Sequence, residues 1–351
     1  MKGGGIEAMI CGLANEMAKT EDVTVCSIFL PKANAVFWNK LVPQVKRISL
    51  GKSKPGFSIS EIFKIYNFIK KGKFDVVNLH GFFYYYAFSV LFLHRKIKFF
   101  YTVHSDANKE NFGWEKRFFV LKKCFFKWKW LHPITISQAS KDSFTHLYGI
   151  DSRLIYNGIP QVGVSKQDLV NEYRITPNTR IFIHAGRISI EKNQVVLCKV
   201  FKSLIEQKLD VVLLIAGSIQ DYKIYESLET HFCERIVYLG ERNDIPQLMA
   251  SCDAMCLPSI WEGLPVTLLE ALSVGCVPIC SPVGGIANVI VDGENGYLSA
   301  TSQEEDYYEK IKLFLSLETQ HFVRMKQKCI ESFANYDIKH TSRNYLEYYR
   351  Q

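Results

Sequence analysis

Two acidic side chains, Glu262 and Glu270, flank the start of a predicted helix. An apolar run at 254–258 precedes them, and Pro265 and Gly275 are typical of the first turn and the end of a helix. The free N–H groups at the start of such a helix favour a phosphate. Carboxylates accept hydrogen bonds from hydroxyls, so one glutamate could hold a sugar and the other a ribose. Two solvated glutamates on a helix would show the same spacing, so the pair alone leaves both interpretations open.

These glutamates fall in the second of two sets of strands that alternate with helical patterns. Such alternation predicts parallel sheets in two doubly wound α/β domains, whose ligands bind at the carboxyl ends of the strands. The first set is predicted at 23–29, 75–80, 98–104 and 132–137, and the second at 180–186, 211–217, 235–240, 254–258 and 277–281.

Turn residues near 157–164 mark the boundary between the two sets. We therefore expect an N-terminal domain at 1–160 and a C-terminal domain at 161–330. Residues 331–351 are expected to form a helix that packs back on the N-terminal domain, with tyrosines along its apolar stripe. The apolar run 82–93 is too short to span a bilayer and is predicted to be a buried helix.

Charge is unevenly spread along the 351 residues. Residues 1–160 hold 24 Lys and Arg against 11 Asp and Glu, a net charge of +13, whereas the remainder holds 19 against 24, a net charge of −5. A basic half favours an anionic partner such as nucleic acid or a membrane surface. No nucleic-acid motif is recognisable, so we expect no nucleic-acid partner.

The ten cysteines are scattered. Cys252 and Cys256, like Cys276 and Cys280, lie in apolar segments, which favours buried small side chains over a zinc site. With no recognisable signal peptide, a reducing, cytoplasmic location is expected.

Several motifs, in order and nearly from end to end, resemble glycosyltransferase family 4, a group of retaining enzymes with the two-domain GT-B fold. They are "GGGIEAMICGLANEMAK", "DVVNLHG", "YTVHS", "ITISQASKDSF", "IFIHAGRISIEKN" and the block around Glu262 and Glu270. The resemblance implies two Rossmann-like domains facing a cleft, with 1–160 on the acceptor side and 161–330 binding the nucleotide-sugar donor.

The resemblance assigns roles to individual residues. Arg187 and Lys192 match the pair that binds the donor diphosphate, where fixed cations stabilise the charge of the leaving group. A solvated surface pair is the competing interpretation. His104 matches the histidine near the reacting sugar and Glu262 is the other catalytic candidate, whereas His80 fits a structural role or acceptor contact equally well. Further donor-binding positions are Gly4, Gly5, Gly263, Leu264, Pro265 and Glu270, and Gly284 and Gly285 have the same backbone role.

The expected activity follows from these assignments. It is a retaining transfer of a hexose-type sugar from a nucleotide-sugar to a glycan or polyprenyl-linked acceptor in bacterial surface polysaccharide synthesis. The sequence has no DxD motif, so neither a metal nor another cofactor is expected. The alternatives are a nucleotide-sugar epimerase of related GT-B fold and a truncated, non-catalytic sugar-nucleotide-binding protein.

One departure from the family concerns the first strand. No apolar run precedes Gly3, so the N-terminal domain is expected to lack the strand that is normally central in its sheet. We expect either a native reading frame that starts about ten to twenty residues upstream, enough for one strand and its turn, or a truncated variant.

The segment 111–132 is both basic and aromatic. Its apolar residues recur at three- and four-residue spacing, which predicts one helix face. The pattern fits a helix on the inner face of the plasma membrane as well as it fits a core helix. The predicted stripe consists of Trp114, Phe118, Leu121, Phe125 and Trp128.

Overall fold

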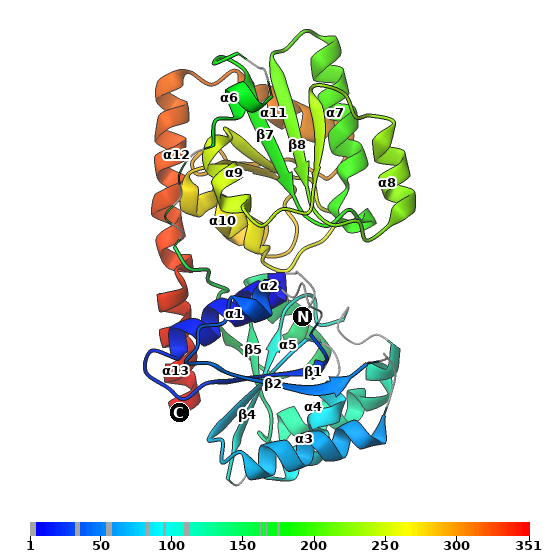
Figure 1. Cartoon of the computed structure of the whole chain (residues 1–351), viewed down its shortest axis with the longest axis vertical. Coiled ribbons are helices and arrows are strands. Elements are labelled where there is room, and N and C mark those ends of the chain that lie inside the picture. The colour runs from blue at the N-terminus through cyan, green and yellow to red at the C-terminus, as the bar shows by residue number, and fades with distance from the viewer. Residues whose placement is uncertain are drawn as a thin grey trace. The chain divides into compact units, whose positions relative to one another are not determined.

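The protein consists of two compact units (Figure 1). Unit 1 comprises Met1–Pro160 and Tyr336–Gln351, and unit 2 comprises Gln161–Asn335. The computed structural model describes residues 5–31, 36–53, 58–81, 84–93, 96–108, 113–161, 163, 165, 167–173 and 176–351.

Unit 2 is built on one six-stranded sheet in the order β12-β11-β10-β7-β8-β9, with every neighbouring pair parallel. The nearly continuous apolar sequences of β7 and β8 suit strands that are covered on both faces, and β8 is buried along its whole length. The strands are β7 (Arg180–Ala185), β8 (Val211–Ala216), β9 (Ile236–Gly240), β10 (Ala254–Leu257), β11 (Val277–Cys280) and β12 (Tyr297–Leu298).

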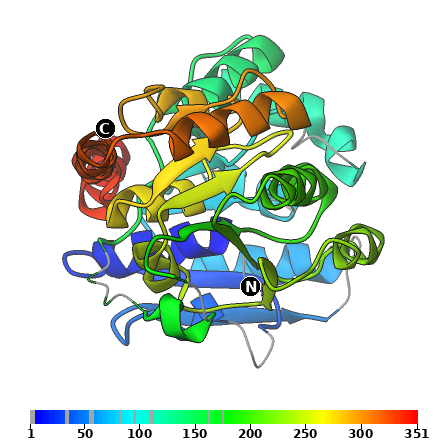
Figure 2. The same cartoon turned by 90° about the horizontal axis from the view of Figure 1, so that it is seen from above.

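Helices lie on both sides of this sheet (Figure 2). Helix α7 packs against α8 and α11, whereas α10 packs against α9 and α12. The predicted helix after the glutamate loop is confirmed, because α10 follows Pro265 and ends at Gly275, whose φ of +69° suits glycine. The helices are α6 (Leu169–Glu172), η3 (Ile190–Lys192), α7 (Gln194–Glu206), α8 (Tyr222–Glu229), α9 (Ile245–Ser251), α10 (Val266–Val274), η4 (Ile286–Asn288), α11 (Glu304–Leu315) and α12 (Thr319–Phe333), where η denotes a 3₁₀ helix.

The described strands of unit 1 form two separate sheets. One has the order β1-β2 and the other β3-β4-β5-β6, and all pairs are parallel. In unit 2 the first strand, β7, lies between its two neighbours at the centre of the sheet. The described residues of unit 1 contain no equivalent strand. The strands are β1 (Thr24–Phe29), β2 (Lys46–Lys52), β3 (Val76–His80), β4 (Lys98–Val103), β5 (His132–Thr135) and β6 (Arg153–Leu154).

The last helix, α13, belongs to unit 1 and packs against α1. Its Tyr345 is buried with Met9 and Leu13 of α1, and Asn78 donates a hydrogen bond to the Tyr349 hydroxyl at 2.8 Å. The chain returns from unit 2 to unit 1 between α12 and α13. A parallel β-bridge pairs Asp337, at this return, with Ile159 of unit 1. The helices are α1 (Gly5–Met17), α2 (Val36–Asn39), α3 (Ile59–Lys71), η1 (Tyr84–Leu93), η2 (Gly113–Phe118), α4 (Phe119–Lys127), α5 (Gln138–Tyr148) and α13 (Ile338–Arg350), with η5 (Ala334–Tyr336) between α12 and α13.

The predicted single stripe over 111–132 is wrong for the part that the structure describes. A 3₁₀ helix, η2, precedes the short α4, so the spacing of the pattern is interrupted. Phe125 is fully buried, whereas Leu121 and Trp128 are exposed. Residues 111–112 and the side chain of Trp114 lie outside the described residues. The segment therefore contributes both to the core and to the surface.

Two other predictions have clear outcomes. Cys252, Cys256, Cys276 and Cys280 are buried in unit 2, as the apolar interpretation predicted. The described part of the run 82–93 is helical but forms the 3₁₀ helix η1, not an α-helix. None of the described helices is long and apolar enough to cross a membrane.

Candidate active site

Lys192 and Glu262 form an ion pair at the carboxyl edge of the unit 2 sheet, with 2.5 Å between Lys192 Nζ and Glu262 Oε1. Lys192 lies in η3 after β7, and Glu262 lies in the loop after β10. Because β7 and β10 are parallel neighbours, their carboxyl ends meet at one edge. Both side chains are largely buried, with 13% and 11% of their surface exposed. The fold therefore holds a cation and a carboxylate together where ligands of such sheets bind.

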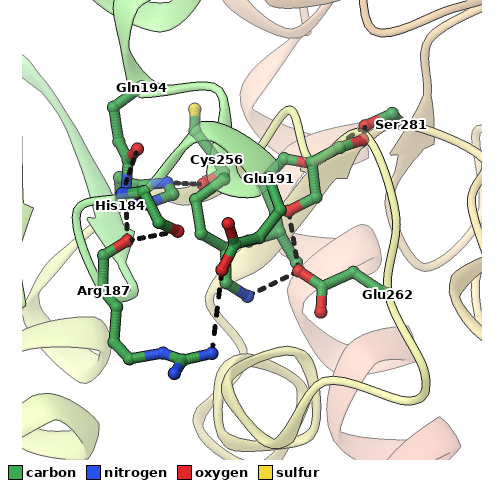
Figure 3. A network of polar contacts seen from close by, with 11 residues as sticks. His184, Arg187, Glu191, Gln194, Cys256, Glu262 and Ser281 are labelled. Atoms are coloured by element: carbon green, nitrogen blue, oxygen red, sulfur yellow. Dashed lines mark hydrogen bonds and ion pairs between the residues drawn. The ribbon is translucent and has the colours of Figure 1, made fainter. Parts of the chain in front are cut away.

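Arg187 lies between β7 and η3, five residues before Lys192. Figure 3 shows its side chain beside that of Glu191. Its guanidinium pairs with Glu191 at 3.7 Å and remains half exposed. The backbone of Glu191 accepts a hydrogen bond from the Ile260 N–H at 2.8 Å, which ties the loop after β7 to the loop after β10. Two cations, Arg187 and Lys192, are thus presented by one short segment beside the loop of Glu262.

Gln194 and His184 fix the conformation of the Arg187 loop (Figure 3). The Gln194 side-chain amide donates to the Arg187 carbonyl at 2.7 Å and lies 3.2 Å from His184 Nε2. His184 Nδ1 lies 2.9 Å from the Cys256 carbonyl oxygen, which can only accept. This arrangement requires a proton on Nδ1 and an acceptor at Nε2. Burial lowers the pKa of His184 to about 4, which agrees with a neutral ring.

The Glu262 loop is supported from β11. Ser259 donates its hydroxyl to Glu262 Oε1 at 2.7 Å, and Ser281 donates to the Ser259 carbonyl at 2.6 Å. Gly284 has φ +58°, and a Cβ at this position would lie 2.0 Å from the Glu262 carbonyl oxygen. Only glycine therefore permits this close approach without a shift of the loop.

The segment between the two glutamates forms the start of α10. The Gly263 carbonyl accepts from the Gly285 N–H at 2.5 Å, Leu264 is buried, and Pro265 is the N-cap residue. Glu270 is partly buried one turn into α10. The start of this helix therefore follows directly on the loop that carries the Lys192–Glu262 pair.

In unit 1, His104 follows β4 and His80 ends β3. His80 Nδ1 and His104 Nε2 lie 3.0 Å apart, so one ring donates to the other. Burial, reinforced by the neighbouring His80, lowers the pKa of His104 well below its usual range, and burial lowers the pKa of His80 to about 4. Both rings are therefore neutral near pH 7. Gly5 begins α1 and is exposed, whereas Gly4 lies outside the described residues.

Sequence reasoning missed the residues that hold the charged side chains Arg187, Lys192 and Glu262 and their loops in place. Glu191 sits four residues after Arg187, a spacing typical of helical ion pairs, and could have been noticed. Ser281 and His184 gave no such signal, because their contacts with the Ser259 and Cys256 carbonyls join segments that are distant in sequence. Ser259 and Gln194 make local contacts, three and seven residues from Glu262 and Arg187, and were not noticed.

Two family models match nearly the whole chain between them. "Glycosyltransferase Family 4" matches residues 3–161, and "Glycosyl transferases group 1" matches residues 165–332. The relatives include the UDP-Gal:alpha-D-GlcNAc-diphosphoundecaprenol alpha-1,3-galactosyltransferase of Escherichia coli, 33% identical over 126 residues, which are 34% of this chain and 33% of that protein.

A second relative is the N,N'-diacetylbacillosaminyl-diphospho-undecaprenol alpha-1,3-N-acetylgalactosaminyltransferase of Campylobacter jejuni, 30% identical over 147 residues. The match covers 42% of this chain and 38% of that one, so the aligned region spans well under half of either relative.

A crystal structure of Anabaena HepE in complex with UDP and glucose shares the fold, with a TM-score of 0.80 at 19% identity over 98% of this chain and 95% of that chain. With adjoining family models over 3–161 and 165–332 and this fold, the chain belongs to the family 4 glycosyltransferases of GT-B fold, as its motifs predicted.

Proposed function

We propose that this chain is a retaining glycosyltransferase that moves a hexose-type sugar from a nucleotide-sugar to a glycan or lipid-linked acceptor in bacterial surface polysaccharide synthesis. The observation that carries the proposal is the Lys192–Glu262 pair with Arg187 in the same loop. Two cations suit a diphosphate, and a carboxylate beside them suits the hydroxyls of the attached sugar.

The reaction we propose proceeds on one face of the donor. The bond between the anomeric carbon and the diphosphate oxygen breaks, and the bond to the acceptor oxygen forms on the same side, while the acceptor proton passes to the leaving diphosphate. Arg187 and Lys192 stabilise the charge that develops on the diphosphate, which removes the need for a metal ion. Glu262 holds the sugar hydroxyls once the diphosphate has drawn Lys192 away from it.

Unit 1 supplies the acceptor side in this proposal. His104 donates a hydrogen bond to a sugar hydroxyl or to the diphosphate, because a neutral imidazole retains one donor. The lipid-linked acceptor is supported by the names of the relatives, two of which refer to diphospho-undecaprenol compounds. The exposed Lys127, Trp128 and Lys129 at the end of α4 support a peripheral position on the cytoplasmic face of the membrane.

A donor screen tests this function. UDP- and GDP-sugars are incubated with the protein, with and without a membrane extract as acceptor, and release of nucleoside diphosphate is measured. We expect slow release from one donor that accelerates with acceptor, and NMR of the product should show the donor's anomeric configuration.

Two outcomes would overturn the proposal. Conversion of the donor to another nucleotide-sugar without acceptor would identify an epimerase. Tight nucleotide binding without turnover across the panel would identify a non-catalytic binding protein. Glu262→Gln is the control variant in the donor screen, because it removes the charge of the carboxylate and keeps the shape of the side chain.

A further inference from the structure

Unit 1 has an open pocket of about 630 Å³ at the amino ends of β4 and β5. Lys98 and His132 are the first residues of these strands, and Lys127 and Lys129 come from the end of α4. His104 follows the other end of β4, so the pocket and His104 are separated by a strand of six residues, roughly 20 Å. The pocket is therefore distinct from the site that the proposed reaction uses.

Three lysines stand in a pocket lining that is otherwise largely apolar. Lys98, Lys127 and Lys129 contribute three positive charges, and Asp151, the acidic side chain in the lining, is already paired with Lys141 at 3.0 Å. Partial burial, together with the nearby Lys98 and Lys129, lowers the pKa of His132. This shift agrees with a positive potential in the pocket, which would attract an anion.

Lys129, one of the pocket lysines, has a positive φ. Lys129 has φ +58° directly after α4, a position where glycine is the usual residue. Its N–H closes the helix by donating to the Phe126 carbonyl at 3.1 Å. A lysine in this conformation is less stable than a glycine would be, and Lys73 and Lys208 have the same conformation after α3 and α7. The residue places a second cation beside Lys127 at the pocket.

An exposed apolar patch adjoins the pocket. We define the α4 patch as Phe92 and Trp128, whose exposed fractions are 66% and 55%. Trp128 lies between Lys127 and Lys129 in sequence, and its ring is 5.2 Å from that of Trp130, which in turn is 5.7 Å from the ring of Phe92. In this short segment Lys127 and Lys129 therefore line the pocket, whereas the side chain of Trp128 is exposed. Tryptophan is enriched where lipid meets water.

We propose that the pocket binds the phosphate head group of an anionic phospholipid while the α4 patch inserts into the surrounding leaflet. Charge complementarity supports a phosphate, and the adjoining α4 patch favours a lipid over a free anion. Helix α4 connects the strand that leads to His104 with the strand that begins at the pocket, so docking along it would orient unit 1 on the membrane. The proposal extends the membrane part of the proposed function.

Vesicle flotation provides the first test. Vesicles of phosphatidylcholine with about 30 mol% phosphatidylglycerol are compared with phosphatidylcholine alone, using the full chain. We expect binding to the anionic vesicles only, and a roughly fivefold weaker affinity for Lys129→Gly, because one lysine near an anionic surface contributes about that factor. Relief of the positive φ should leave the folded state at least as stable.

Lys73→Gly is the matched control. Lys73 is an exposed lysine of unit 1 with φ +51°, so its substitution removes the same charge and relieves the same strain away from the pocket. We expect an unchanged vesicle affinity. Equal losses for Lys73→Gly and Lys129→Gly would mean that binding follows net charge, which overturns the pocket.

The ring signals of His132 provide a direct readout of the pocket. Dihexanoyl phosphatidylglycerol below its micelle-forming concentration should shift the NMR signals of His132 at concentrations where inorganic phosphate does not. An equal response to phosphate would identify a free-anion site and overturn the lipid assignment. Vesicle binding without any His132 response would overturn the pocket. None of these measurements involves sugar transfer, so their failure is distinct from failure of the proposed function.

Discussion

The two units differ in how their parallel strands are arranged in sheets. In unit 2, β7 lies at the centre of a continuous six-stranded sheet, and all its residues except the first are buried. In unit 1 the described strands form a two-stranded and a four-stranded sheet, and β1 and β3 contain no fully buried residue. The contrast indicates that the Lys192–Glu262 pair rests on one continuous sheet, whereas the described strands of unit 1 are divided between two sheets.

The difference matters for how precisely side chains are held. Arg187 and Lys192 follow the central strand β7. Lys192 pairs with Glu262 of the neighbouring β10 loop, and Gln194 holds the Arg187 carbonyl within its own loop. We therefore expect the strongest and most local effects of substitution in unit 2.

The largest effect should come from Lys192→Ala. Loss of one charge that stabilises the leaving diphosphate typically lowers kcat by about 10²–10³, and Glu262 would also lose its partner. Steady-state kinetics with the preferred donor would measure this. Lys199→Ala, an exposed lysine of α7 in the same unit, should change kcat less than twofold, and a similar loss there would assign the effect to net charge.

A pair of core substitutions compares the two sheets directly. Leu214→Ala in the fully buried β8 should destabilise unit 2 by about 2–5 kcal/mol, because the substitution leaves a cavity in a tightly packed core. Leu79→Ala in the partly buried β3 should cost roughly 1 kcal/mol, since less apolar surface is lost. Hydrogen exchange read separately for the two units would measure both, and equal costs would show that the sheets are equally well packed.

Acidification should weaken unit 1 more than unit 2. The folded pKa of His80 is about 4, below the usual 6.5, so unfolded chains take up a proton first as the pH falls. The associated stability is complete above pH 6.5 and is lost between pH 6.5 and 4, by roughly 3 kcal/mol for such a shift. His104 acts in the same direction in unit 1, and His184 does so in unit 2.

Exchange protection of β3 and β4 should accordingly fall more steeply with acidification than that of β7. The comparison requires rates corrected for the intrinsic effect of pH on exchange. Parallel losses of protection in both units would contradict the role assigned to the His80–His104 pair.

A further substitution tests the backbone of the Glu262 loop. Gly284→Ala should destabilise by about 1–3 kcal/mol and lower activity, because the new Cβ would collide with the Glu262 carbonyl. Gly293→Ala has a similar positive φ of +81° but open space around the Cβ. We expect a comparable strain there with unchanged kcat/KM, and a matching loss of activity at both glycines would argue against a positional role for Gly284.

Much of the fold could be predicted because its strands are apolar runs with clear ends. Strand β2 was missed because "KRISLGK" is largely exposed and carries charges at both ends. The short β6 and β12 have only two residues each, too few for any pattern.

The candidate site was predictable only in part. Motifs marked Arg187, Lys192 and Glu262, but the supporting contacts of Ser281 and His184 depend on which strands become neighbours. The His80–His104 contact could have been inferred, since both residues stand at the carboxyl ends of adjacent parallel strands.

The central claim is that Lys192 and Glu262 act on one donor molecule, and a double-mutant cycle on kcat/KM tests it most directly. Lys192→Ala, Glu262→Gln and the double variant would be compared with the unmodified chain, using the donor found in the screen. We predict coupling of at least about 1 kcal/mol, so that the double variant loses much less than the product of the two single losses. Strictly multiplicative losses would show that the two side chains act independently and would contradict the account.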